Sequence, residues 1–244
     1  MVQELWLSEI LRKRASMWGA QRRGLSEVAF IMTHKPYGPY EMYFKRPLDI
    51  LCGVVAVIFF SWLYIILMFL GVIFMRGNPF FTQERPGKNE KIFRLIKFRT
   101  MDNRKDKNGD LLPDEVRLNK YGRFLRKTSL DELPEAFNII KGDMSVIGPR
   151  PLLVKYLPRY NPQQHRRHEV RPGLSGYAQV HGRNSVSWPE KFKMDVEYVD
   201  HITFLGDLKI ILDSVMAAFV KRNGISSATS ATMEEFMGSE VPAE

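Results

Sequence analysis

One long apolar run dominates the pattern of hydrophobic and polar positions along the chain. Residues 50–75 include no charged side chain. As a helix they would extend about 39 Å, which exceeds the roughly 30 Å of a hydrocarbon core. A core helix of a water-soluble protein is seldom apolar on every face over such a length. The run therefore predicts insertion into a membrane.

The charges beside this run bear on whether it spans the membrane or enters and returns. Basic residues flank both of its ends: Lys45, Arg46, Arg76, Arg85 and Lys88. Because basic residues favour the cytoplasmic side, this symmetry favours a re-entrant segment with two limbs, each about 20 Å long. The break that such a segment needs has one polar candidate, Ser61, which is followed by Trp62 and not by proline. On these residues alone, both membrane geometries stay open.

Shorter patterns follow the apolar run. Segments 80–84 and 91–99 are typical of strands, and the turn-rich residues 85–89 between them predict a β-hairpin. The polar residues 102–115 predict a surface loop.

Apolar residues at helical spacing predict three helices after the hairpin, over residues 118–125, 132–140 and 208–219. The last of these has an apolar face that either packs on the core or lies in the membrane interface. We therefore expect a helix-dominated α+β fold.

The patterns also divide the chain into segments. We interpret 1–41 as a non-native or flexible extension with Met42 as the native start, and a membrane-surface helix over 5–18 is the alternative. The remainder is expected to form a membrane-inserted segment, a globular domain and a flexible tail of small polar residues, over 42–77, 78–224 and 225–244.

The composition limits the classes of binding partner but does not identify one. The chain of 244 residues has a net charge of +9, which suits nucleic acid, anionic lipid or phosphorylated substrates. No pattern of a nucleic-acid-binding module is present, so we expect no nucleic-acid partner. The single cysteine, Cys52, excludes an intrachain disulfide and a cysteine metal cluster.

The densest group of reactive side chains lies in residues 127–134. Pro134 belongs in the first turn of a helix, and Ser129 with Glu132 has the spacing of a capping box. Either placement puts the acidic pair, Asp131 and Glu132, at a helix N-terminus, where the helix dipole favours carboxylates and bound phosphate. A carboxylate beside a phosphate can act as a nucleophile or a metal ligand. The alternative is that both acids only cap the helix.

Basic residues placed by strands and turns favour the first interpretation. They end a strand, precede the acidic pair, or occupy proline-fixed and glycine-rich turns: Lys97, Arg99, Arg126, Arg150, Arg171 and Arg183. Guanidinium groups match phosphate oxygens, so two acids among these cations predict a Mg²⁺-dependent phosphate site. A solvated basic face is the alternative.

Other motifs are absent or unconvincing. The sequence contains neither a P-loop nor a dinucleotide-binding glycine motif. His165 and His168 have a spacing that zinc ligands can have, but Arg166 and Arg167 lie between them. We therefore expect a basic surface patch over 165–168.

Six ordered motifs together resemble the bacterial sugar transferases, which are monotopic phosphoglycosyl transferases. They are Lys45-Arg46-Pro47-Leu48-Asp49, Lys97-Phe98-Arg99-Thr100-Met101, Ser129-Leu130-Asp131-Glu132-Leu133-Pro134, Gly142-Asp143-Met144-Ser145, Gly148-Pro149-Arg150-Pro151, and Arg171-Pro172-Gly173-Leu174-Ser175-Gly176 continuing to Gly182-Arg183-Asn184. The short chain looks most like the small members, the best-known of which transfer N-acetylated amino-sugar phosphates such as diacetylbacillosamine phosphate.

The resemblance implies a ping-pong reaction. Asp131 would attack the β-phosphate of a UDP-sugar, UMP would leave, and undecaprenyl phosphate would then take the sugar phosphate from Asp131. Mg²⁺ would be held by one or both of Asp131 and Glu132, and Glu132 would either bind this metal or activate the acceptor. The six basic residues above are the expected phosphate contacts, and Asp195, which matches an acidic position of the family, is expected among the substrate contacts.

The resemblance also implies a location. A re-entrant membrane helix would place a small catalytic domain, with its β-hairpin and interfacial amphipathic helices, on the cytoplasmic face of the bacterial inner membrane. Membrane phospholipid and a second copy of the chain are the further partners expected, in protein glycosylation or lipopolysaccharide synthesis. Family members commonly carry Ser-Pro at the helix break, whereas this chain has Ser61-Trp62.

Two rival functions explain part of the sequence. A membrane-anchored basic module that binds anionic lipid accounts for the charge and the apolar run, but not for acids among positioned arginines. A metal-dependent phosphodiesterase would release UMP without a lipid acceptor. The multi-spanning class of phosphoglycosyl transferase is excluded by the single apolar run.

Overall fold

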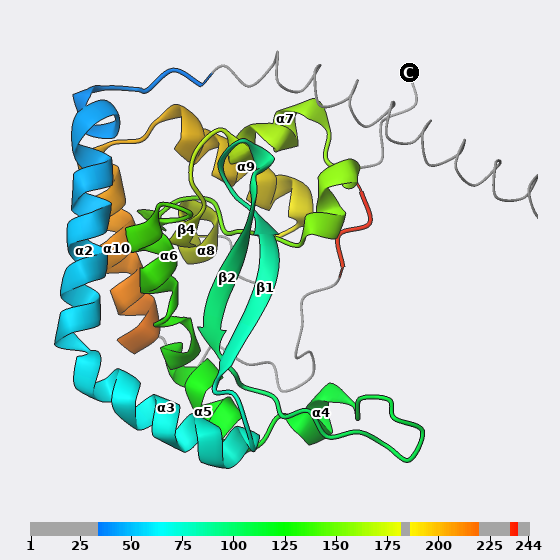
Figure 1. Ribbon diagram of the computed structural model, residues 1–244. Helices are drawn as coiled ribbons and strands as arrows, with labels where there is room; N and C mark the ends of the chain where they lie inside the picture. The colour runs from blue at the N-terminus through cyan, green and yellow to red at the C-terminus, as the bar shows by residue number, and fades with distance from the viewer. Residues whose placement is uncertain (1–33, 182–185, 220–234, 239–244) are drawn as a thin grey trace, which may run out of the picture.

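Two apolar helices form an L along one side of the molecule. The computed structural model describes residues 34–181, 186–219 and 235–238 (Figure 1). Within it, the π-helix η1 (Tyr40–Phe44) leads into α2 (Lys45–Phe59), and α3 (Ser61–Met75) follows at a bend of 65°. Among these residues no single helix has the length and apolarity to cross a membrane, whereas the bent pair taken together does.

Contacts with the rest of the chain hold this bend. Ser61 is the first residue of α3, and the N-cap residue before it, Phe60, makes no side-chain capping hydrogen bond. Instead, the Tyr64 hydroxyl donates to the backbone oxygen of Leu133 over 2.5 Å, and the Tyr121 hydroxyl donates to that of Leu67 over 2.8 Å. The Tyr64 hydroxyl and the Leu67 carbonyl, both in α3, are thereby hydrogen-bonded to segments that are distant in sequence. The expected break therefore occurs next to Ser61, and these contacts attach α3 to the domain.

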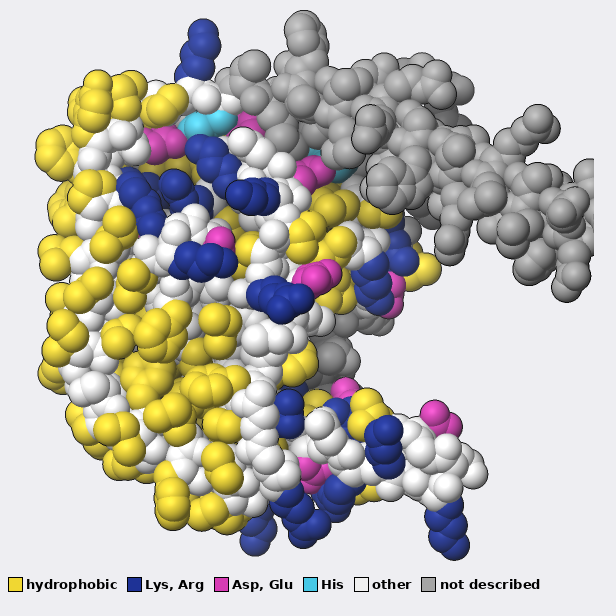
Figure 2. Space-filling view, in the orientation of Figure 1, with side chains coloured by type: hydrophobic (Ala, Val, Ile, Leu, Met, Phe, Trp, Pro, Cys, Tyr) yellow, Lys and Arg dark blue, Asp and Glu magenta, His cyan; other side chains and the backbone are white. Residues whose placement is uncertain are grey.

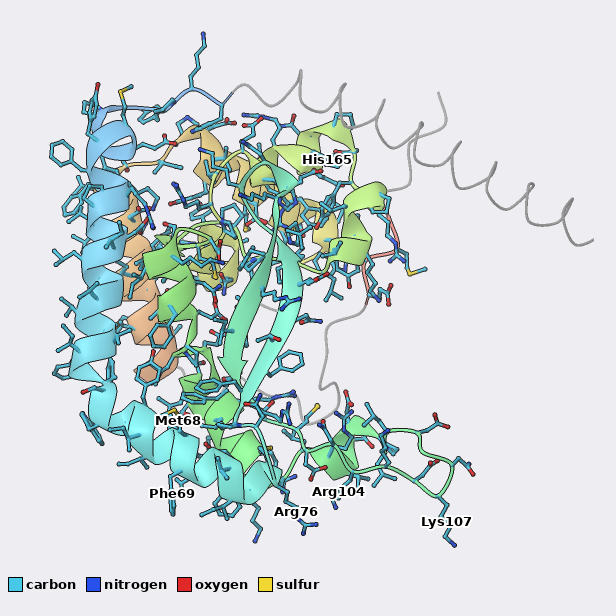
Figure 3. The ribbon with its side chains drawn as sticks, viewed as in Figure 1. Met68, Phe69, Arg76, Arg104, Lys107 and His165 are labelled. Carbon is cyan, nitrogen blue, oxygen red and sulfur yellow. The ribbon has the colours of Figure 1, made fainter. Side chains whose placement is uncertain are left out.

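The outer faces of α2 and α3 are apolar and exposed. Hydrophobic side chains cover this edge of the molecule in Figure 2, and Phe59, Ile65 and Phe69 are each about two-thirds exposed. Figure 3 shows Met68 on the inner side of α3 and Phe69 on its outer side. Met68 packs against the core cluster of Tyr64, Leu67, Phe98, Tyr121 and Leu125.

The predicted hairpin is confirmed. Strand β1 (Phe80–Pro86) pairs antiparallel with β2 (Ile92–Phe98), and the short helix η2 (Lys88–Glu90) lies in the connection. The predicted loop is irregular up to Pro113, where α4 (Asp114–Arg117) begins. This loop, which includes Arg104 and Lys107, projects away from the rest of the domain (Figure 3).

Two of the predicted helices follow the loop. The first is α5 (Lys120–Thr128), and the second, α6 (Glu135–Lys141), packs against both α2 and β2. The second helix was predicted to begin at Glu132, three residues before α6 begins. The chain between the two helices starts at Ser129, which adopts a left-handed conformation (φ 56°) and ends α5. The short helix η3 (Leu130–Glu132) follows it before α6 begins.

The structure contains a small parallel sheet that the sequence pattern did not predict. Strand β3 (Ser145–Ile147) pairs with β4 (Gly173–Ser175). At this junction the backbones approach so closely that a Cβ atom on Gly173 would lie 2.0 Å from the nitrogen of Gly148, which only glycine tolerates. The pairing brings together the two proline-containing turns, at residues 148–151 and 171–173, which are distant in sequence.

Six further elements complete the domain. They are η4 (Val154–Arg159), α7 (Pro162–His165), η5 (Arg166–His168), α8 (Tyr177–His181), α9 (Trp188–Asp200) and α10 (Phe204–Phe219). The last is the third predicted helix. Ile210 on α10 is buried in the core, while Leu205 and Leu212 are exposed, so the helix has one face in the core and another apolar face outside it.

Two predicted segments contain packed residues where the structure describes them. Residues 34–41 belong to the segment interpreted as a non-native or flexible extension, and here the Tyr40 hydroxyl donates to Asp207 over 2.7 Å and His34 contacts Glu41 over 2.5 Å. In the predicted flexible tail, Phe236 is only 2% exposed. Residues 1–33, including the alternative helix over 5–18, lie outside the described residues.

Candidate active site

The acidic pair lies in a tight turn between two helices. Asp131 and Glu132 belong to η3, and Pro134 occupies the N-cap position of α6. Ser129 makes no side-chain capping bond there, so the predicted capping box does not form. The sequence placed the acidic pair at the N-terminus of the helix. In the structure the pair lies in η3, just before α6 begins.

Two cations hold the carboxylate of Glu132. Lys97 Nζ lies 2.8 Å and Arg150 Nη2 lies 2.9 Å from Oε1 of Glu132. Burial by itself would raise the pKa of Glu132, but Arg150 and Lys97 outweigh it and lower the pKa to about 2. Glu132 is therefore ionised and fixed in place, with its other oxygen left open.

The carboxylate of Asp131 is held much less. No described side chain forms an ion pair or hydrogen bond with it. Burial and the neighbouring Glu132 raise the pKa of Asp131, while Lys97 and Arg126 act in the opposite direction. A carboxylate with free oxygens, partly removed from water and close to cations, is suited to attack a phosphorus atom.

Glu135 is a third acid of this site, which the sequence analysis missed. Its side chain is buried, and Oε1 lies 3.0 Å from Lys97 Nζ. Burial and Glu132 raise the pKa of Glu135 to about 7, against the influence of Lys97. Its spacing of three residues from Glu132 was a usable signal, because residues three apart share a helix face.

Asn138 sets the position of Lys97 and was also missed. This residue of α6 is 1% exposed, accepts a hydrogen bond from Ile96 N over 3.0 Å, and donates one to Arg94 O over 2.8 Å. The side chain thus closes the edge of β2 just before Lys97. A buried asparagine inside an apolar helix face was the only local sign of this role.

The turn that presents Arg150 is supported from behind by a buried ion pair. Arg167 Nη2 donates to Arg150 O over 2.7 Å and to Asp195 Oδ2 over 2.7 Å. Both charged side chains are nearly inaccessible. Asp195 therefore holds the Arg150 turn through Arg167 and lies behind it, whereas the sequence analysis placed it among the substrate contacts.

The predicted surface patch at 165–168 is wrong for its last two residues. Arg167 and His168 are 3% and 4% exposed. Burial lowers the pKa of His168 well below its usual value, so the ring is neutral. His165 contacts Glu90 of the hairpin connection.

Of two further predicted cations, Arg126 lies near the acidic pair. Arg126, near the end of α5, donates to Thr100 Oγ1 over 3.0 Å, and its charge acts on the pKa of Asp131. The guanidinium of Arg99 forms no hydrogen bond or ion pair with any described residue, although its backbone nitrogen donates to Pro79 O over 2.7 Å. Arg99 is thus a cation available to a ligand.

Arg171 is a predicted phosphate contact that the structure does not bring to the pair. Arg171 Nε donates to Gly142 O over 3.0 Å, at the opposite end of α6 from Glu132. There Arg46 also caps carbonyls, including Ile139 O over 2.8 Å, so both arginines satisfy a helix C-terminus. Arg183 lies outside the described residues.

Asp131 and Glu132 are the side chains that could hold a magnesium ion together with water and substrate phosphates. Among the described residues, no group of three or more His, Cys, Asp or Glu side chains could hold a metal ion. Mg²⁺ commonly uses one or two carboxylates and takes its remaining ligands from water and substrate phosphates. The open oxygens of Asp131 and Glu132 fit that arrangement.

Comparison with known proteins points to one family. The sequence profile of the bacterial sugar transferases matches residues 40–221. The chain is 48% identical over 200 residues to the uncharacterized sugar transferase EpsL of Bacillus subtilis, which covers 81% of this chain and 98% of EpsL.

Two relatives have names that state a reaction. The chain is 36% identical to the UDP-N-acetylgalactosamine-undecaprenyl-phosphate N-acetylgalactosaminephosphotransferase of Aeromonas hydrophila, over 72% of this chain and 44% of the relative. It is 34% identical to the undecaprenyl-phosphate galactose phosphotransferase of Salmonella typhimurium, over 75% of this chain and 41% of the relative. The chain thus spans less than half the length of these two proteins.

Proposed function

Because this chain belongs to the bacterial sugar transferase family, we propose that it transfers a sugar 1-phosphate from a UDP-sugar to undecaprenyl phosphate and releases UMP. The observation that carries this proposal is the contrast within the acidic pair. Glu132 is bound by Lys97 and Arg150, whereas Asp131 keeps its carboxylate free among cations. The names of the relatives from Aeromonas and Salmonella support the same reaction class.

In the first half of the proposed reaction, a carboxylate oxygen of Asp131 attacks the β-phosphorus of the UDP-sugar. A new P–O bond forms to Asp131, and the bond between this phosphorus and the oxygen that bridges to UMP breaks. UMP leaves with the bonding electrons. The product is a phosphosugar ester of Asp131.

In the second half, an oxygen of undecaprenyl phosphate attacks the same phosphorus. The P–O bond to Asp131 breaks, which restores the carboxylate and yields undecaprenyl diphosphate sugar. The proton balance closes without a co-reactant, because the acceptor attacks as a phosphate oxyanion.

The charged residues around the pair would stabilise the transferring phosphoryl group. Lys97 and Arg150 fix Glu132 beside Asp131, and Arg99 and Arg126 supply positive charge for the diphosphate. Bound Mg²⁺ would neutralise diphosphate charge, with Asp131 and Glu132 as the protein ligands. The open Oε2 of Glu132 suits either a metal or a hydrogen bond to the acceptor.

We further propose that the bent pair α2–α3 is a re-entrant membrane segment. The exposed apolar faces of α2, α3 and α10 support it, because exposed apolar surfaces of this extent mark membrane or protein contacts. Both ends of the pair are tied to the same domain, by Lys45 to Asp207 and by Asn119 to Phe74 O. The domain would then lie on the cytoplasmic face, with phospholipid around the helices.

UMP release from a panel of UDP-sugars, with Mg²⁺ and with or without undecaprenyl phosphate, tests the reaction. Our first choice of donor is an N-acetylated amino sugar, and the sugars in the relatives' names complete the panel. We expect UMP that depends on the acceptor. Equal turnover without the acceptor would indicate a phosphodiesterase, and binding of anionic lipid without UMP release for any donor would indicate a lipid-binding module.

A further inference from the structure

A short C-terminal segment returns to the catalytic domain from outside the family match. The match ends at residue 221, and residues 235–238 lie against η4 and α9. Phe236 is 2% exposed, although it follows a polar stretch that predicts no packed structure.

Rings and ion pairs hold this segment. The ring of Phe236 lies 5.0 Å from that of Phe192, 5.6 Å from Trp188 and 5.7 Å from Tyr160, measured between centroids. Glu235 pairs with Lys155 over 2.6 Å and with Arg159 over 2.8 Å, and Arg159 also donates to Phe236 O. A buried aromatic centre with charged contacts at its rim is the arrangement of a specific docking site.

The rings that receive Phe236 also hold the cation behind the active-site turn. The Arg167 guanidinium lies over the ring of Phe192 at 5.5 Å and over that of Tyr160 at 5.9 Å. Arg167 in turn donates to Arg150 O over 2.7 Å. Arg150 then binds Glu132. A continuous set of contacts thus runs from the C-terminal segment to the acidic pair.

We propose that Glu235 and Phe236 form a positioning element of the active site, in which Phe236 fixes the rings that hold Arg167 and thereby the Arg150 turn. This inference rests on the proposed function, because it gives the Arg150 turn a catalytic task. Phe236 acts only through other residues and touches none of the reacting groups. Two aromatic neighbours of Arg167 would lose their packing without it, and small displacements of positioned groups lower rates strongly.

A purely structural role for the segment makes a different prediction. A clamp that only adds stability would change the fraction of folded protein and leave the turnover of each folded molecule unchanged. A positioning element changes turnover and loosens the backbone near Arg150 while the rest of the domain keeps its protection. Hydrogen exchange of the peptide around residues 148–153 separates the two roles, because the cause and the effect are both local.

The test uses full-length Phe236→Ala, with Met237→Ala as the matched control, because the Met237 side chain is 76% exposed. For Phe236→Ala we expect kcat for acceptor-dependent UMP release to fall by roughly tenfold to a hundredfold, with faster exchange at 148–153. Met237→Ala should match the wild type in both measurements. Phe236→Leu keeps an apolar side chain but loses the ring contacts, so it should show a smaller fall of kcat in the same direction, and it replaces the alanine variant should that fail to fold.

Wild-type kcat and wild-type exchange at 148–153 in folded Phe236→Ala and Phe236→Leu would overturn the proposal. So would a loss of folded protein with unchanged turnover per folded molecule. If the wild type releases no UMP from any donor, the proposed function fails. The exchange measurement still decides in that case whether Phe236 holds the Arg150 turn.

Discussion

Two charged regions of the molecule differ in how completely their acids are bound. At the start of α2, the carboxylate of Asp207 accepts hydrogen bonds from Lys45, Tyr40 and Tyr198, at 2.6 to 2.8 Å. At the turn before α6, Asp131 has no such partner among the described residues, although several cations are close.

The difference separates anchoring from chemistry. The Lys45–Asp49 motif ties the apolar helices to the domain: Lys45 binds α10, Arg46 binds the end of α6, and Asp49 accepts from Val146 N over 3.0 Å. Each of these groups is occupied by the fold. The carboxylate of Asp131 has no such partner and lies near cations, so it is available to a substrate. Substitutions in the two regions should therefore have different consequences.

The largest effect is expected for Asp131→Asn. The amide cannot form the phosphosugar ester, so turnover should fall by at least roughly 10⁴-fold, as for removal of other catalytic groups. Because Asp131 has no ion pair to lose, the denaturation midpoint should not fall. Steady-state UMP release and chemical denaturation check both statements. Residual turnover above one hundredth of the wild type would rule out Asp131 as the nucleophile.

Arg150→Gln should have the next largest effect on turnover. Glu132 would lose one of its two cations, and we expect kcat to fall by about 10²–10³-fold, in the range seen when one stabilising donor is removed. Arg94→Gln, a change at an exposed position of the hairpin, is the control and should be neutral. Equal kcat values for the two variants would show that Arg150 has no part in the site.

Asp49→Ala tests the anchor. The substitution leaves Val146 N without its partner, which should lower the free energy of unfolding by about 1–3 kcal/mol. The turnover of each folded molecule should stay unchanged. Cys52→Ala, at an exposed position of the same helix, is the control. A loss of kcat without a loss of stability would mean that the two regions do not divide as described.

Glu135→Gln should have the smallest effect, visible as a change of pH dependence. The fold raises the pKa of Glu135 from 4.5 to about 7, so the folded state binds more protons than the unfolded chain between these values. Stability from this residue is therefore present below about pH 4.5 and falls as the pH rises towards 7. Denaturation at pH 5 and 7.5 should show a smaller decline for Glu135→Gln, whereas the exposed control Glu84→Gln should match the wild type.

Local patterns predicted much of the fold and the acidic pair. Alternation and turn residues were sufficient for the hairpin, and proline-fixed turns pointed to Arg150 beside the acids. The β3–β4 pairing and the clamp made by Asn138 depend on contacts between distant segments, which leave no period in the sequence. Arg171 shows the opposite error, because it was predicted to contact phosphate and instead binds a backbone carbonyl at the C-terminus of α6. A guanidinium group in a rigid turn suits either role.

The intact mass of the protein after exposure to the active UDP-sugar, without acceptor, tests the central claim most directly. The wild type should gain the mass of one sugar phosphate and lose it when undecaprenyl phosphate is added. Asp131→Asn should gain nothing. A wild type that turns over without any adduct, or an equal adduct on Asp131→Asn, would contradict the assignment of Asp131 as the nucleophile.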